Sequence, residues 1–213
     1  MRQGLRSMVR RSSRKAKDQL HLAARARHAG YFTAKQAAEL GYTYPLLHYH
    51  TRVGNIEHAG HGLYRLAAVP ISEHDDLVRL TLWSRDRSDE PQAVVSHVTA
   101  LVVHDLTDLL PRSIHLTVPP RFQKKVPPGC KLHRDVLANT DIEERDGFRV
   151  TTPLRTLVDA ASSPEVPQEE LEMAVRSALD RGLTRRSALV EAAQSETAWN
   201  RLRLALDHTS GDS

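Results

Sequence analysis

The fold of the chain's first part is decided by residues 30–66, which read GYFTAKQAAELGYTYPLLHYHTRVGNIEHAGHGLYRL. Just before this stretch, the apolar spacing of residues 18–29 predicts a helix that ends at the first glycine. Thr33 is a typical N-cap residue, so a second helix is expected over residues 34–40. Gly41 suits the end of that helix because glycine readily adopts the left-handed conformation found there.

A third helix is predicted to run from Thr43 to about Val53. Thr43 suits the N-cap, and Pro45 suits the first turn, where a missing N–H loses no hydrogen bond. Two short helices joined by a glycine-containing turn form a helix-turn-helix, whose second helix enters the DNA major groove. The sequence therefore predicts such a unit in residues 18–68; a small helical domain used for protein contacts is the alternative.

The third helix has two chemically different sides at about 100° per residue. Its inward side comprises Leu46, Leu47, His50 and Val53. Its outward side comprises Pro45, His48, Tyr49 and Arg52. The outward side offers a guanidinium, an imidazole and a phenol to base edges and phosphates, and Arg52 is expected to reach a guanine or a phosphate.

Residues 56–66 alternate around a glycine-rich tip, which predicts a β-hairpin, the wing of a winged helix-turn-helix. His58 and His61 lie near the tip and Arg65 lies on the return strand, where they would touch phosphate or the minor groove. An exposed loop in which the two histidines have no role is the alternative. The predicted DNA-binding residues are Lys35, Pro45, His48, Tyr49, Arg52, His58, His61 and Arg65.

Charge is divided unequally along the chain. Residues 1–68 carry twelve Lys/Arg and three Asp/Glu, whereas residues 69–213 carry eighteen and twenty-three, so the formal charges are +9 and −5. This split favours a polyanionic partner for the N-terminal part. Residues 1–17, with seven Lys/Arg and no acid, predict a basic arm. It would lie along a DNA backbone, enter a minor groove or simply be solvated.

Composition is that of an ordinary globular protein, with 213 residues, 40% of them hydrophobic and 5% aromatic. The longest apolar runs are far too short to span a bilayer, so no membrane partner is expected. The basic N-terminus is not followed by the apolar segment of a secretory signal. Cys130 is the single cysteine, which excludes a disulfide within the chain and suits a reducing cytoplasm.

Residues 72–213 predict a mixed α/β domain with a helical C-terminus, so the expected fold class is α+β. Helices are expected over residues 75–83, 97–106, 154–161, 168–181, 184–193 and 198–207. Strands are expected over residues 93–95, 114–118 and, more weakly, 131–134. Residues 142–150 predict a hairpin that turns at Asp146-Gly147, a strong turn signal.

The second domain shows no sequence sign of an enzyme. His97 and His104 share a helix face but lie two turns apart, about 10 Å, which is too far for one metal ion to bridge. With one cysteine and no closely spaced histidine pair, a zinc site is not expected. Glycine-rich nucleotide loops are also lacking. We therefore expect no catalytic residues, no metal and no cofactor.

Five stretches in residues 18–161 carry a family resemblance: GYFTAKQA (30–37), Gly54 with GLYRL (62–66), AVVSHVTAL (93–101), IHLTVP (114–119) and VTTPLRTLVD (150–159). In their order and spacing, the chain resembles the AbiEi-type antitoxins of type IV toxin–antitoxin (abortive infection) systems. The resemblance implies a winged-helix domain that represses the family's own two-gene operon. It also implies a C-terminal antitoxin domain that counteracts a cognate toxin of nucleotidyltransferase type. The implied setting is the bacterial cytoplasm, with double-stranded promoter DNA as a partner.

The residues that match the family's most recognisable positions are Ser96, His97, Thr152, Arg155 and Asp159. The resemblance gives them a role in antitoxin function, and their alternative roles are structural. Ser96 and Thr152 suit helix caps, and Arg155 with Asp159 suits an ion pair one turn apart.

The second domain has two other candidate functions. Related front halves can continue into a nuclease, but no Asp…Glu-x-Lys cluster follows on strands here. A plain winged-helix transcription regulator, whose second domain senses a ligand or dimerises, stays the alternative. Direct contact with the toxin, its modification and competition for its target are equally open.

Overall fold

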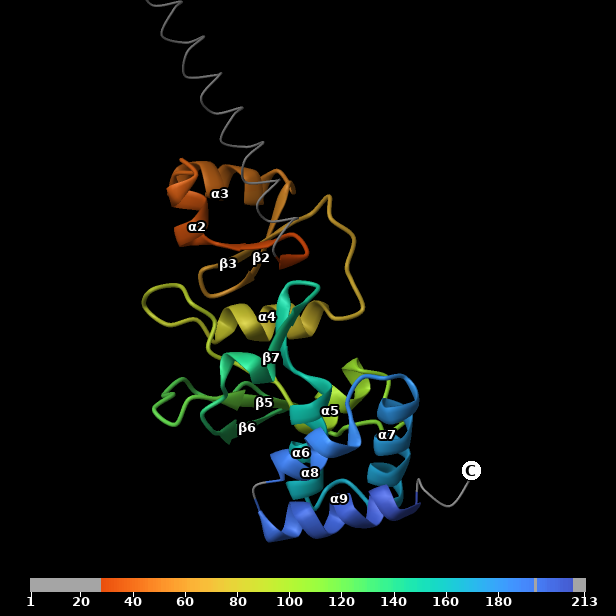
Figure 1. The fold of residues 1–213 in the computed structure, drawn as a ribbon. Helices are drawn as coiled ribbons and strands as arrows, with labels where there is room; N and C mark the ends of the chain where they lie inside the picture. Colours follow the sequence, from red (N-terminus) through yellow and green to blue (C-terminus); the bar gives the residue numbers. More distant parts are fainter. Residues whose placement is uncertain (1–27, 194, 209–213) are drawn as a thin grey trace, which may run out of the picture. The chain divides into compact units, whose positions relative to one another are not determined.

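The computed structural model describes residues 28–193 and 195–208, which form two compact units (Figure 1). The first unit holds the described residues up to Pro91 together with Asp146–Phe148; the second holds Gln92–Arg145 and the residues from Arg149 on. The arm over residues 1–17 and nearly all of the helix expected over residues 18–29 lie outside the described residues.

In the first unit, two short helices precede a hairpin. The strands β1 (Tyr31–Thr33), β2 (Ile56–Gly60) and β3 (Leu63–Leu66) form an antiparallel sheet in the order β1-β3-β2. The helices α2 (Ala34–Glu39) and α3 (Tyr44–Arg52) lie between β1 and β2 in the chain. Both helices fall within one residue of their predicted bounds. The core beneath them contains Phe32, Ala37, Tyr42, Leu47, Ile56, Tyr64 and Leu66.

The start of α2 is fixed by Thr33. Its hydroxyl accepts from the Gln36 N–H at 2.9 Å, and the Gln36 side chain accepts from the Thr33 N–H at 2.9 Å, which completes a capping box. The same hydroxyl donates to Asp89 Oδ2 at 3.2 Å. Asp89 follows the helix α4 (Asp75–Trp83), so the segment after α4 is tied to the beginning of α2.

The helix α4 belongs to the first unit, although the sequence placed it in a second domain beginning at residue 72. The Tyr31 hydroxyl of β1 donates to Asp75, the first residue of α4. Burial and this carboxylate raise the pKa of Tyr31 to about 12. The observed division therefore falls after Pro91.

The two threonine N-caps give a matched stability test. Thr33→Ala is expected to lower the free energy of unfolding by about 1 kcal/mol because it removes a capping hydrogen bond. Thr43 occupies the N-cap of α3, but among the described residues its side chain makes no capping hydrogen bond. Thr43→Ala is therefore the control and should have a clearly smaller effect in chemical denaturation. Equal losses would mean that the Thr33 capping box contributes little.

The second unit is built on a mixed sheet in the order β6-β5-β4-β8-β7. Its elements are β4 (Val94–Val95), β5 (Ile114–Val118), β6 (Cys130–Arg134), the short 3-10 helix η1 (Asn139–Asp141), β7 (Ile142–Arg145) and β8 (Phe148–Thr151). β4 pairs antiparallel with β5 and parallel with β8, and β5 pairs parallel with β6. The predicted turn between β7 and β8 is confirmed, because Asp146 and Gly147 both have positive φ, 48° and 92°.

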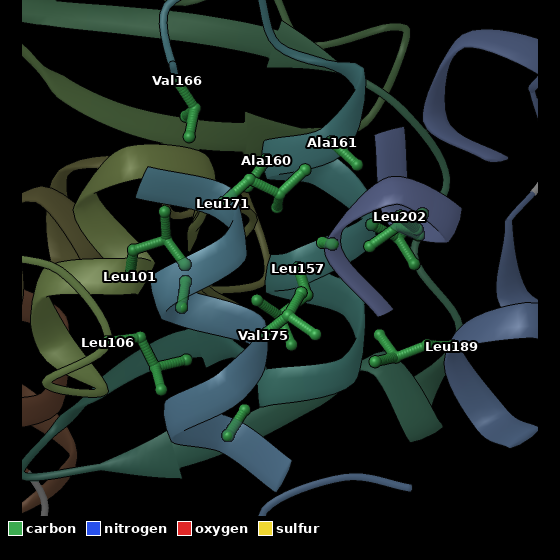
Figure 2. Close-up of a cluster of buried hydrophobic side chains, with 14 of the residues drawn as sticks. Leu101, Leu106, Leu157, Ala160, Ala161, Val166, Leu171, Val175, Leu189 and Leu202 are labelled. Carbon is green, nitrogen blue, oxygen red and sulfur yellow. The ribbon is translucent and has the colours of Figure 1, made fainter. Parts of the chain in front are cut away.

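Helices supply most of the second unit's core. They are α5 (His97–Val103), α6 (Pro153–Ser162), α7 (Gln168–Asp180), α8 (Arg186–Ala192) and α9 (Glu196–His208). Figure 2 shows Leu101, Leu157, Val175 and Leu202 from α5, α6, α7 and α9 within one buried cluster. The predicted α+β class is confirmed. No helix within residues 28–193 and 195–208 has the length and apolar character needed to cross a membrane.

Arg201 of α9 fastens the connection between α6 and α7. Its guanidinium donates to the carbonyl oxygens of Ala161, Ser163 and Val166 at 3.3, 2.8 and 2.5 Å. It also donates to the Gln168 side chain at 3.1 Å. One side chain thus satisfies carbonyl groups at the end of α6 and in the link that follows, where helix carbonyls lack partners of their own.

Candidate functional site

The outward side of α3 is exposed to solvent, as expected. Pro45, His48 and Arg52 are exposed, and Tyr49 is 52% exposed. Tyr44, which the sequence interpretation passed over, is 73% exposed at the first helical position. This side of the helix therefore presents aromatic, imidazole and guanidinium groups.

The inward side of α3 was predicted correctly in part. Leu47 is buried, and Leu46 and His50 are half-buried, with the His50 ring 5.5 Å from that of Tyr42. The placement of Val53 was wrong, since it is 46% exposed. The helix ends at Arg52, and Val53 is its C-cap residue, so the helical spacing no longer applies there.

Arg65 is buried, whereas the sequence prediction required it to be accessible on the return strand. It is only 6% exposed. Its guanidinium pairs with Glu57 at 3.3 Å and donates to the carbonyl oxygens of Leu66 and Val69 at 3.3 and 2.9 Å. These bonds hold β3 and the residues after it. Lys35, His58 and His61, by contrast, are exposed.

A surface hollow lies between α3 and the β2–β3 hairpin. It has a volume of about 310 Å³ and is lined by Tyr44, His48, Thr51, Arg52, His58 and Tyr64. The structure thus brings three predicted residues together and adds Tyr44, Thr51 and Tyr64. Tyr44 could have been found from the sequence because it stands one helical turn before His48.

In the second unit, the structure gathers the residues singled out by the resemblance. The Arg155 Nε donates to Asp159 Oδ1 at 2.8 Å, which is the predicted pair one turn apart. His97 Nδ1 lies 3.0 Å from Ser96 Oγ and 4.0 Å from Asp159 Oδ2. Thr152 instead caps α6, where its hydroxyl accepts from the Arg155 N–H at 3.4 Å.

Arg155 has acidic partners that the sequence did not reveal. Its guanidinium lies 2.5 Å from Asp135 Oδ2 and 3.7 Å from Asp141 Oδ2. Burial alone would lower the pKa of Arg155, but the carboxylates of Asp159 and Asp135 raise it overall. Arg155 therefore stays charged and joins α6 to the segment between β6 and β7.

His97, His115 and His133 form a histidine cluster that connects α5 with β5 and β6. The rings of His97 and His133 are stacked with centroids 3.5 Å apart. His133 Nε2 lies 3.1 Å from His115 Nδ1, and His115 Nε2 lies 3.2 Å from Glu165. The parallel pairing of β5 and β6 brings His115 and His133 together, and α5 adds His97, so no local sequence signal could have found the cluster.

The histidine cluster is uncharged at neutral pH. Burial, followed by the neighbouring imidazoles, lowers the pKa of His97 to about 3 and that of His133 to about 4. Burial also lowers the pKa of His115. The 4.0 Å approach of His97 to Asp159 is therefore not an ion pair, because the imidazole carries no charge.

Asp159 and His97 both adopt energetically unfavourable states, Asp159 through burial of its carboxylate and His97 through its backbone conformation. Asp159 is 5% exposed, and within the described residues its Oδ2 atom has no hydrogen-bond partner. Burial, only partly offset by Arg155, raises the pKa of Asp159 to about 6. His97 has φ 53°, a left-handed backbone that strains a residue with a side chain. Unsatisfied carboxylates and strained backbones concentrate at functional sites.

Ser96 does not cap α5 as predicted. It occupies the N-cap position, but within the described part of the chain its side chain makes no capping hydrogen bond. Its buried hydroxyl accepts from Thr117 at 2.8 Å instead. A Ser-His-Asp relay needs the serine and the carboxylate on opposite imidazole nitrogens. Here both approach Nδ1 of His97, so this geometry does not activate a serine nucleophile.

Within residues 28–193 and 195–208, no group of at least three His, Cys, Asp or Glu side chains is arranged to hold a metal ion. His104, which the sequence places on the same helix face as His97, is the C-cap residue of α5. It is buried, and its Nε2 forms a hydrogen bond with the Thr151 carbonyl oxygen at 2.7 Å.

Residues 21–67 match a family model described as "Transcriptional regulator, AbiEi antitoxin". The resemblance to AbiEi-type antitoxins is thereby confirmed over these residues. No curated protein matches the chain.

The fold resembles the crystal structure of the RV2827C protein from Mycobacterium tuberculosis. The TM-score is 0.58 at 18% sequence identity, over 95% of this chain and 76% of the other. At this identity the likeness concerns the fold alone, and it extends across both units.

Proposed function

We propose that the chain is an antitoxin-type transcription regulator that works in the bacterial cytoplasm. Its first unit would act as a winged helix-turn-helix on duplex DNA of its own promoter. Its second unit would counteract a cognate toxin of nucleotidyltransferase type. The observation that carries this proposal is the match of residues 21–67 to the AbiEi regulator family.

The geometry of the first unit supports DNA binding. α2 and α3 are joined by a short turn, and the β2–β3 hairpin follows them in the chain, as a wing would. α3 exposes His48, Tyr49 and Arg52, groups that donate hydrogen bonds to phosphates and base edges. α3 would thus enter the major groove.

Arg52→Ala is expected to weaken binding to a duplex from the chain's own promoter region by about 1–3 kcal/mol. The reason is the loss of a charged donor from the exposed side of α3. Fluorescence anisotropy at fixed salt measures the change. Arg87→Ala is the matched control, since Arg87 is an exposed arginine of the same unit in the segment that follows α4. Unchanged affinity in Arg52→Ala would mean that another face meets DNA.

The antitoxin role is proposed for the second unit. Its support is the cluster around His97, Arg155 and Asp159, where a strained backbone and an unsatisfied buried carboxylate are maintained. Co-expression with a nucleotidyltransferase encoded next to this chain's gene tests the role. The proposal expects the full chain to restore growth. Continued toxicity, with the antitoxin shown to be produced, would refute it.

A plain transcription regulator is the second candidate. The observation that favours it is that the family match ends at residue 67, before the second unit begins. In that case the chain would bind its promoter with normal affinity but would not rescue cells from the neighbouring gene's product. The same co-expression experiment therefore separates the two candidates.

A further inference from the structure

We infer that the hollow between α3 and the β2–β3 hairpin holds one backbone phosphate of the bound DNA. This inference rests on the proposed DNA binding and makes it more specific. A helix in the major groove and a hairpin reaching toward the minor groove stand on opposite sides of one sugar-phosphate strand. That strand must pass between the two elements, which is where the hollow lies.

The lining of the hollow suits an anion. Arg52 supplies a cation, His48 and His58 supply imidazole N–H groups, and Tyr44 and Tyr64 bring hydroxyl-bearing rings. Among the described residues, no carboxylate lines the hollow. Glu57, which precedes His58, is already paired with Arg65 at 3.3 Å.

The hairpin side of the hollow is supported by buried aromatic rings. Tyr64 is 9% exposed and stacks on Phe32 with ring centroids 5.9 Å apart. The His58 ring stands nearly perpendicular to the Tyr64 ring at 5.3 Å. His58 is therefore positioned by a buried aromatic pair before any ligand arrives, which reduces the entropy lost on binding.

The helix side of the hollow is one stripe of α3. Tyr44, His48 and Thr51 follow the spacing i, i+4 and i+7, which places them on one side of the helix. The Thr51 hydroxyl already donates to the Leu47 carbonyl oxygen at 2.9 Å, so Thr51 forms a wall and provides no free donor.

This arrangement separates the exposed residues that hold the phosphate from those that contact bases. His48, Arg52 and His58 hold the phosphate, a contact that carries no sequence information. Pro45 and Tyr49 are exposed on α3 but do not line the hollow. Base preference is therefore assigned to Tyr49 and Pro45, and Arg52 acts as an anchor whatever the sequence.

The salt dependence of DNA binding tests this assignment on the full chain. Affinities are measured between about 50 and 200 mM NaCl for a duplex from the chain's own promoter region and for a scrambled duplex. His58→Ala and Arg52→Ala are each expected to weaken binding to both duplexes by roughly tenfold. Arg52→Ala should also reduce the slope of log K against log salt by about 0.9, the value for one lost contact between a cation and a phosphate. Tyr49→Ala should keep the slope and reduce the preference for the promoter duplex.

Two results would overturn the inference while the proposed function survives. The first is a wild-type slope in Arg52→Ala together with a lost preference for the promoter duplex in both Arg52→Ala and His58→Ala. The second is saturation of the hollow by inorganic phosphate, seen as NMR shifts of His58, that bound DNA does not displace. Arg87→Ala should behave as wild type in every measurement. If the wild-type chain binds neither duplex at any salt concentration, the proposed function itself fails.

Discussion

Arg201→Ala is expected to lower the free energy of unfolding of the second unit by roughly 2–3 kcal/mol. The guanidinium satisfies the carbonyl oxygens of Ala161, Ser163 and Val166. Without it, these acceptors lose their donors at the junction of α6, α7 and α9. Chemical denaturation followed by circular dichroism measures the loss.

The stabilisation depends on the forked shape of the guanidinium, because this one planar group donates hydrogen bonds to several acceptors at once. Arg201→Lys is therefore expected to recover only a minor part of the loss. Arg203→Ala is the control, since Arg203 lies exposed on the same helix. A loss below 1 kcal/mol in Arg201→Ala would show that water replaces the arginine at these carbonyl groups.

Asp159→Asn is expected to stabilise the second unit above neutral pH. The folded pKa of Asp159 is about 6, above the ordinary value of 3.8. Between about pH 4 and pH 6 the folded state therefore binds more protons than the unfolded state, and stability falls as the pH rises through this window. The total cost is roughly 3 kcal/mol. Asparagine keeps an oxygen for Arg155 but never ionises, so the variant avoids that cost.

The measurement is the difference in unfolding free energy between Asp159→Asn and the wild type from about pH 4 to pH 8. The difference should be small at pH 4 and should grow until about pH 6.5. The histidine cluster titrates in both proteins, so the difference isolates Asp159. Asp135→Asn is the contrasting control: Arg155 lowers the pKa of Asp135 against the opposing effect of burial, so this variant should lose stability at neutral pH. A flat difference for Asp159→Asn would contradict the buried, unsatisfied carboxylate.

The same variant bears on function. If Asp159 serves the antitoxin role, Asp159→Asn should be folded and more stable but should fail to rescue cells from the toxin. Stability given up for function is common at such sites. Full rescue by Asp159→Asn would show that Asp159 has no antitoxin role and acts only as a structural partner of Arg155.

Elements with local signals were predictable from the sequence. Thr33 and Gly41 bound α2, and Asp146-Gly147 marks the turn between β7 and β8, because each acts through its own backbone conformation. The exposed side of α3 follows from helical spacing alone. These features need no knowledge of distant contacts.

Predictions failed where a tertiary contact replaces a local preference. Ser96 suits a cap, but its hydroxyl is engaged with Thr117 of β5. Arg65 looks like a phosphate contact, but Glu57 and two carbonyl groups hold it inside the first unit. The helix expected over residues 97–106 stops at Val103, close to Asp105, which adopts φ 55°.

The candidate site of the second unit was half predictable. The pair Arg155–Asp159 is visible from spacing, but the partners Asp135 and Asp141 are not. The histidine cluster depends on the parallel register of β5 and β6, which pairs Thr117 with His133. Strand pairing across different segments has no signature in a single sequence. The histidine cluster could therefore be recognised only once the pairing of β5 with β6 was known.

The bonds from β1 and α2 to the α4 segment limit how this protein can be recombined. Tyr31 bonds to Asp75 and Thr33 bonds to Asp89. A transplanted segment that ended at residue 68 would leave both hydroxyl groups without these partners. Shuffling of such segments between different second units, in evolution or by design, would succeed only if residues 69–91 were inherited together with the helices they support.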